Sequence, residues 1–174
     1  MLEISCIVNV DTRPENSTNQ EMFKGVVDRD FLIEGLINKR NLFKGFDFEL
    51  ICFLDEHVDE KTIAHMREIC DTLIIRKHDK RFEDIDNYAA FNDLNYLQGL
   101  FHARGKYVFH FDGDVAAFSV SPEPIREYIA LLEQYDYVSY PSYWSPNPVE
   151  DASFGGKYWV STRFFCCKRS TLDV

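Results

Sequence analysis

The stretch KYVFHFDGDV, residues 106–115, is an apolar run that ends in two carboxylates separated by one glycine. Its aromatic and β-branched content is typical of a strand covered on both faces, as in the interior of a parallel sheet. Asp112 and Asp114 follow where the chain leaves the sheet, and in open α/β sheets ligands collect at the carboxyl ends of the strands. Alternation along the strand places both carboxylates on the same side. The stretch therefore predicts a ligand site at the end of a buried strand.

The Asp-Gly-Asp sequence suits a divalent cation. Mg²⁺ and Mn²⁺ prefer carboxylate oxygens, usually one or two from the protein with the rest from water and phosphate groups. Gly113 lets the backbone turn and lets a ligand approach closely. We therefore predict that Asp112 and Asp114 bind Mn²⁺ or Mg²⁺ shared with a phosphate-bearing ligand. The alternative is a hairpin turn, because Asp-Gly is a common hairpin sequence, but no alternating apolar run follows it.

The composition is that of one globular domain with a substantial core. The chain has 174 residues, of which 45% are apolar and 15% aromatic. Its 19 Lys and Arg against 29 Asp and Glu give a net charge of −10, which argues against nucleic acid or an anionic membrane surface as a partner. The first ten residues lack the basic start of a signal peptide, and no apolar run is long enough for a transmembrane segment. We expect a cytoplasmic protein.

The five cysteines are expected to be reduced and structural. They show no paired short spacing of the zinc-ribbon type, and free cysteine is among the residues most often buried. The adjacent Cys166 and Cys167 would point to opposite faces of a strand, so they are not expected to share a metal. The five positions are Cys6, Cys52, Cys70, Cys166 and Cys167.

Strand and helix patterns alternate through the first half of the chain. Apolar runs predict strands, and apolar residues at helical spacing predict helices between them. This order predicts a parallel sheet with right-handed crossovers. The expected elements are strands at 2–10, 48–54 and 72–75 and helices at 31–43 and 59–70.

The second half continues with a helix at 88–104, which leads directly into the strand at 107–111. A Ser-Pro-Glu-Pro sequence at 121–124 predicts the start of another helix, and strands are expected at 137–140 and 157–168. Between them, residues 141–156 form a loop rich in Tyr, Trp and Pro. This loop either stacks on sugar rings and closes over a ligand, or is anchored by one buried Trp.

Polar segments follow several of the expected strands at the same edge of the sheet. The loop at 11–17 offers a hydroxyl, a guanidinium and side-chain amides that suit the base and ribose of a nucleotide, and Asp55 ends the second strand. The basic stretch at 76–87, which includes Arg81, is either a phosphate or base contact or a solvated face. His110 lies within the strand at 107–111 and is interpreted as a buried core histidine.

Taken together, these residues resemble the family 2 glycosyltransferases, which have the nucleotide-diphosphosugar transferase (GT-A type) fold. The resemblance is carried by ISCIVNV and its Thr-Arg-Pro-Glu loop at 4–15, ELICFLD at 49–55, and Gly99 followed by ARGKYVFHFDGD at 103–114. It implies a single Rossmann-like α/β domain over residues 1–174, with a mostly parallel central sheet flanked by helices. Residues 1–115 would form the nucleotide-sugar-binding part and residues 116–174 a partial acceptor side.

The resemblance also implies an activity: transfer of a sugar from a nucleotide-diphosphosugar, of the UDP- or GDP-sugar type, to a hydroxyl of a glycan or other acceptor. Inversion and Mn²⁺ or Mg²⁺ are typical of the family. Asp112 would reach the ribose or the metal shell, and Asp114 would ligate the metal that bridges the diphosphate.

Other positions would contact the nucleotide. By the same resemblance, Thr12, Arg13 and Glu15 would lie around it, and Asp55 would contact the base or ribose.

The sequence departs from the family in two places. Leu97 stands where the family often has an Asn, which puts one donor contact in doubt. The general base of inverting members usually follows the acceptor-side strand, and here little but Asp173 follows Cys167. Either the chain is a piece of a catalytic domain without the base or the base lies elsewhere, so no catalytic base is assigned.

Two other functions remain open. One is a metal-dependent phosphotransferase or phosphatase with Asp112 as nucleophile and Asp114 beside it, although Ala116 stands where that class usually has Thr. The other is a nucleotide-sugar-binding module without catalytic activity.

Overall fold

The fold was analysed in a computed structural model of the chain. Its described residues are 2–10, 29–55, 58–76, 99–113, 115, 117, 121–141 and 160–172. Strands and helices alternate through the first half, as the sequence predicts. The strands are β1 (Ile4–Val10), β2 (Phe48–Asp55), β3 (Thr72–Arg76), β4 (Tyr107–Asp112), β5 (Tyr137–Pro141) and β6 (Val160–Lys168). The helices are α2 (Arg29–Leu42), α3 (Glu60–Ile69), α5 (Glu123–Leu132) and the 3₁₀ helix η3 (Arg169–Leu172).

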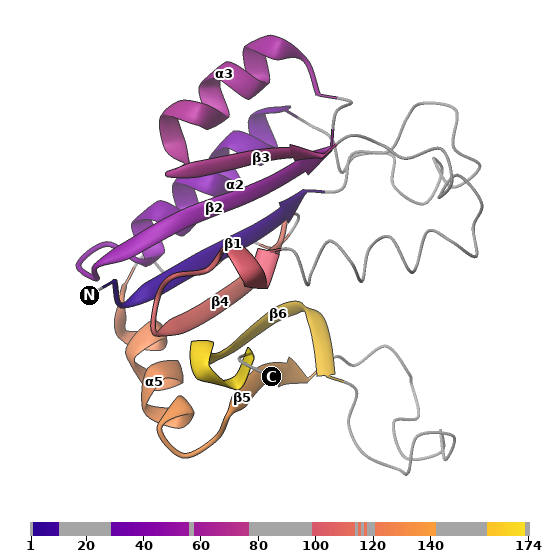
Figure 1. Cartoon of the computed structure of the whole chain (residues 1–174). Coiled ribbons are helices and arrows are strands. Elements are labelled where there is room, and N and C mark those ends of the chain that lie inside the picture. Colours follow the sequence, from indigo (N-terminus) through magenta and orange to yellow (C-terminus); the bar gives the residue numbers. More distant parts are fainter. Residues whose placement is uncertain are drawn as a thin grey trace, which may run out of the picture.

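The strands form one six-stranded sheet in the order β3-β2-β1-β4-β6-β5 (Figure 1). The pairs β1–β2, β1–β4 and β2–β3 are parallel, so these four strands end at the same edge. Strand β6 runs antiparallel to both of its neighbours. The expected mostly parallel α/β sheet is confirmed, and the two last strands of the chain extend it on the β4 side.

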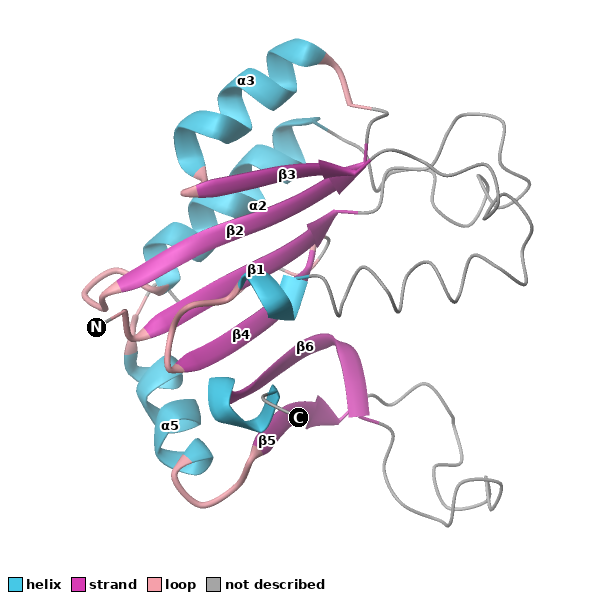
Figure 2. Cartoon of the chain, in the orientation of Figure 1, coloured by secondary structure: helices cyan, strands magenta, loops and turns pink. Residues whose placement is uncertain are grey.

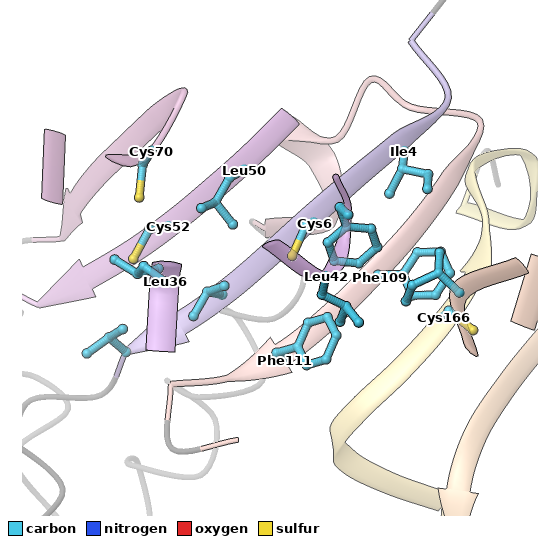
Figure 3. Packing of buried hydrophobic residues seen from close by; sticks show 14 of the residues in the cluster. Ile4, Cys6, Leu36, Leu42, Leu50, Cys52, Cys70, Phe109, Phe111 and Cys166 are labelled. Atoms are coloured by element: carbon cyan, nitrogen blue, oxygen red, sulfur yellow. The ribbon is translucent and has the colours of Figure 1, made fainter. Parts of the chain in front are cut away.

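Helices α2, α3 and α5 pack on one face of the sheet, where α2 and α3 lie side by side (Figure 2). Figure 3 shows Leu36 and Leu42 of α2 against Cys6, Phe109 and Phe111 of the sheet. These residues are 3% exposed or less. The amphipathic pattern of the helices thus matches the continuously apolar strands beneath them.

The opposite face carries a second buried cluster, which includes Ile7, Phe53 and Val108. Ala103 packs there, one residue after a helical segment at 99–102, together with Leu172 of η3. The rest of the helix expected at 88–104 lies outside the described residues, as does the aromatic loop at 142–156. Both faces of the central strands are therefore buried, which is why β1 and β4 have apolar side chains on both sides.

A buried carboxylate joins three chain segments near the amino ends of the central strands. Glu49 is 3% exposed, and its Oε1 accepts hydrogen bonds from Ser5 Oγ at 2.6 Å and from the Arg104 backbone N–H at 2.9 Å. The Arg104 guanidinium binds the other oxygen, with Nε at 2.8 Å. Ser5 Oγ in turn accepts from the backbone N–H of Gly105 at 2.7 Å. These bonds compensate the buried charge and fix where the chain enters β4.

All five cysteines are free and buried. Cys6, Cys52, Cys70 and Cys166 belong to the cluster beneath the helices, and Cys167 to the cluster on the other face. The expected burial of the thiols, and the placement of Cys166 and Cys167 on opposite faces, are confirmed. Burial raises the pKa of Cys6, and it raises the pKa of Cys166 to about 12 and that of Cys167 to about 11.

Replacement of Gly105 by Ala is expected to destabilise the fold. A Cβ at Gly105 would lie 2.4 Å from the carbonyl carbon of Ile4 and 2.5 Å from the Ser5 nitrogen, which are backbone atoms that cannot turn away. We expect Gly105→Ala to lower the free energy of unfolding by about 2–3 kcal/mol in urea denaturation. The control is Gly35→Ala in α2, whose Cβ would lie 3.6 Å from the nearest atom. It should be neutral or stabilising, because alanine favours helix. Equal stability of the two variants would contradict this packing.

The raised thiol pKa values predict low reactivity in the folded protein, because the thiolate is the reactive form. This applies to Cys6, Cys166 and Cys167, and burial shields all five thiols from reagents. At pH 8, a thiol reagent should therefore modify none of the five cysteines in native protein and all five in urea. The folded pKa values of about 12 and 11 lie above the ordinary value of 9.0, so the neutral thiols stabilise the fold below about pH 9. That contribution is lost as the pH rises through 11 to 12, which urea denaturation across this range can measure. Rapid labelling of native protein would contradict the predicted burial.

Candidate functional site

The carboxyl ends of β1, β2 and β4 meet at one edge of the sheet. Val10 pairs with Leu54 of β2, and Asn9 pairs with Asp112 of β4. Asp55 is the last residue of β2 and pairs with Arg76 of β3. Because the strands are parallel, Asp55 and Asp112 end their strands on either side of β1 at the same edge. This is the position at which open α/β sheets bind their ligands.

Asp112 is partly buried, and the chain turns directly after it. The backbone N–H of Gly113 donates to the carbonyl of Asn9 at 2.6 Å, and the N–H of Val115 donates to the carbonyl of Asp112 at 3.1 Å. A Cβ on Gly113 would lie 3.1 Å from that Asn9 oxygen and from Val10 Cγ2, which is closer than an ordinary contact. Glycine is therefore needed here to keep the turn against β1.

Asn9 and His110 form a buried polar pair beside Asp112. The Asn9 Nδ2 atom lies 3.1 Å from His110 Nε2, and the His110 ring stacks on Phe165 of β6 with centroids 4.7 Å apart. His110 is fully buried, so its interpretation as a core histidine is confirmed. Asn9 is 9% exposed, and its Oδ1 is a buried oxygen with no hydrogen-bond partner among the residues described.

Helix α2 holds the loop that follows Gly113. The Asn38 side chain donates to the Ala117 carbonyl at 2.8 Å and accepts from the Ala117 N–H at 2.9 Å. The Lys39 ammonium donates to the Val115 carbonyl and lies over the Phe111 ring, 5.5 Å from its centroid. Lys39 is fully buried. Two consecutive residues of α2 thus bind two alternate residues of the loop.

The structure describes only part of the predicted site. It places the backbone of Asp55 and the side chain of Asp112 at the same edge. The other predicted site residues lie outside the described part of the chain, and their proposed contacts stay predictions; they are Thr12, Arg13, Glu15, Arg81 and Asp114.

The oxygen donors at this edge fit a hard divalent cation. Asp112 supplies a carboxylate, and Asn9 Oδ1 is a buried amide oxygen on the neighbouring strand at the same level. Among the described residues, no three His, Cys, Asp or Glu side chains form a group that could hold a metal by themselves. Of the described side chains, that of Asp112 would hold a cation here, together with water and phosphate oxygens, as is usual for Mg²⁺.

Sequence reasoning did not identify Asn38 and Lys39. One signal was present for Lys39, because it lies seven residues after Leu32 and three after Leu36, on the apolar stripe of α2. A lysine on the buried face of a helix requires a partner, since an unpaired buried charge is strongly unfavourable. One such partner, the Val115 carbonyl, lies 76 residues further along the chain, and no local pattern reveals it.

In the part of the chain that is described, no helix has the length and apolar character needed to cross a membrane.

Comparison of the fold with known structures gives matches over nearly the whole chain. The crystal structure of S. aureus TarS 1–349 matches with a TM-score of 0.55 and 14% identity, over 98% of this chain and 48% of TarS. The mannosyltransferase PcManGT of Pyrobaculum calidifontis, in complex with GDP-Man and Mn²⁺, matches with a TM-score of 0.53 and 13% identity, over 98% of this chain and 46% of that one.

A third match is 4-diphosphocytidyl-2C-methyl-D-erythritol synthase from Anaerococcus prevotii. Its TM-score is 0.52 at 17% identity, over 97% of this chain and 71% of that one. No protein-family model matches the sequence, and no curated protein matches it.

The chain spans about half the length of TarS and PcManGT. At these identities the likeness concerns the fold. The chain has a GT-A-like fold, that of the nucleotide-diphosphosugar transferases, as its sequence predicts.

Proposed function

We propose that this chain is the donor-binding part of a metal-dependent glycosyltransferase. The reaction is transfer of a sugar from a nucleotide-diphosphosugar, of the UDP- or GDP-sugar type, to a hydroxyl of a glycan or other acceptor, with inversion at the sugar carbon. The observation that carries the proposal is the convergence of the ends of β1, β2 and β4, which sets Asp112 level with Asn9 and on the same edge as Asp55.

The fold supports this proposal from a second direction. A structure with the same fold, PcManGT, binds GDP-Man and Mn²⁺. In the present chain, the buried oxygen of Asn9 beside the carboxylate of Asp112 offers oxygen donors of the kind that Mn²⁺ and Mg²⁺ prefer. A chain of net charge −10 has no general attraction for phosphate, so a cation is the natural means of holding a diphosphate.

Each residue has a distinct part in this scheme. Asp114 would hold the cation, and Asp112 would contact the cation shell or the ribose. Asp55 would contact the base or ribose from the end of β2. A cation held there would supply Lewis-acid stabilisation of the negative charge on the leaving diphosphate.

The remaining donor contacts come from two other segments. Thr12, Arg13 and Glu15 surround the nucleotide after β1, and Arg81 contacts phosphate or base after β3. A guanidinium suits phosphate because it donates two parallel hydrogen bonds.

Thermal unfolding tests the proposal. A nucleoside diphosphate with Mn²⁺ should raise the Tm, and ligand at 100 times its Kd corresponds to about 2.7 kcal/mol of added stability. Asp114→Ala should abolish the metal-dependent part of the shift. The control is Asp47→Ala, which removes the same charge from an exposed residue that precedes β2, at the opposite edge. The proposal fails if no nucleoside diphosphate gives a metal-dependent shift in the unmodified chain.

Product analysis separates the three functions that the sequence leaves open. Sugar transfer or metal-dependent hydrolysis of the donor identifies a glycosyltransferase. Binding of the nucleotide-sugar without either reaction identifies a binding module. Hydrolysis of simple phosphate esters that is lost in Asp112→Asn identifies a phosphatase.

A further inference from the structure

Helix α2 contacts backbone atoms of three residues in the loop after β4. The carbonyl of Gly113 faces Gly35, the carbonyl of Val115 accepts from Lys39, and the carbonyl and N–H of Ala117 both bind Asn38. The carbonyls of three alternate residues of the loop therefore face one helix. Asp114 lies in sequence between the first two of these contacts.

The free-energy cost of burying the Lys39 ammonium indicates a role beyond packing. Lys39 is fully buried, and burial of an ammonium is costly unless hydrogen bonds and charge compensate it. Its described compensation comes from a loop carbonyl and from the face of Phe111, the residue before Asp112. A hydrophobic residue at this position would fill the core at lower cost but would not bind the loop.

Asn38 binds the loop at two points. Its amide donates and accepts at once, so it fixes both the position and the direction of the Ala117 peptide. The Val115 carbonyl is held two residues earlier by Lys39, so two described residues of the loop are bound to α2. A ligand that needs both carboxylates in one geometry gains affinity when that geometry is already formed.

We propose that Asn38 and Lys39 are positioning residues that hold the loop after Asp112, through Val115 and Ala117, in place for metal binding before a ligand arrives. The link to the metal rests on the proposed function, whereas the holding of the loop does not. In the described part of the chain, both residues act on the loop through the backbone of Val115 and Ala117.

Two variants and two matched controls test this role. Asn38→Ala removes both amide contacts, and Lys39→Met removes the ammonium while it keeps a long side chain. Asn41→Ala changes an exposed asparagine of the same helix, and Lys61→Met changes an exposed lysine of α3. The controls remove the same chemical groups without touching the loop.

The first measurement is amide hydrogen exchange by NMR in the ligand-free protein. The Ala117 amide donates to Asn38 and the Val115 amide donates to Asp112. We expect both to exchange about tenfold faster in Asn38→Ala and Lys39→Met, with the amides of β1 and β4 unchanged. The two hydrogen bonds lost in Asn38→Ala, or the one bond to a charged group lost in Lys39→Met, correspond to about that factor. Unchanged loop exchange in both variants would overturn the proposal whether or not the protein binds a nucleotide.

The second measurement is the affinity of a nucleoside diphosphate with and without Mn²⁺, by calorimetry. We expect the gain in affinity from Mn²⁺ to fall about tenfold in both variants and to stay the same in both controls. A general loss of stability would lower the fraction folded but not this ratio. If the unmodified chain gains affinity from Mn²⁺ and the variants gain as much, the positioning role is wrong. If the unmodified chain gains none, the proposed function fails, and the exchange measurement alone decides whether α2 holds the loop.

Discussion

The buried carboxylate of Glu49 is the interaction on which the arrangement of the central strands depends. It joins Ser5 of β1 to Arg104, three residues before β4 begins, and Glu49 itself belongs to β2. One charged group therefore determines the relative positions of three parallel strands near their amino ends. Because a slip of one residue would turn every side chain to the other face of the sheet, where it would meet different neighbours, a register fixed at one end is also fixed at the other. The pairing of Asp112 with Asn9, at the carboxyl ends of the strands, therefore depends on the hydrogen bonds of Glu49 at their amino ends.

Most elements of the fold could be predicted from the sequence, because strands buried on both faces are continuous apolar runs and the helices between them have a clear stripe. The end of β2, expected at residue 54, lies one residue later, and α2 begins at Arg29 instead of residue 31. The position of β6 between β4 and β5 was not predicted. Its pairing with β4 joins residues more than 50 positions apart, and local periodicity carries no information about such a partner.

The residues of the candidate site that could be predicted are those that end a strand. Asp55 and Asp112 follow apolar runs, so their place at the edge of a parallel sheet could be inferred. The contacts of Asn38 and Lys39 with the loop could not be inferred, because a polar residue in a helix usually lies at the surface and the loop is distant in sequence. The buried pair of Asn9 and His110 likewise depends on the alignment of β1 with β4. Local sequence patterns thus predict the elements better than they predict the contacts between elements.

The antiparallel direction of β6 has a consequence for how such a protein can change over time. Strand β5 ends at Pro141 and β6 starts at Val160, and both positions lie toward the edge that holds Asp112. Residues 142–159 are therefore joined to the described sheet at the edge that holds Asp112. The described strand pairings are formed by other residues, so the sequence and length of this connection can vary while those pairings stay the same.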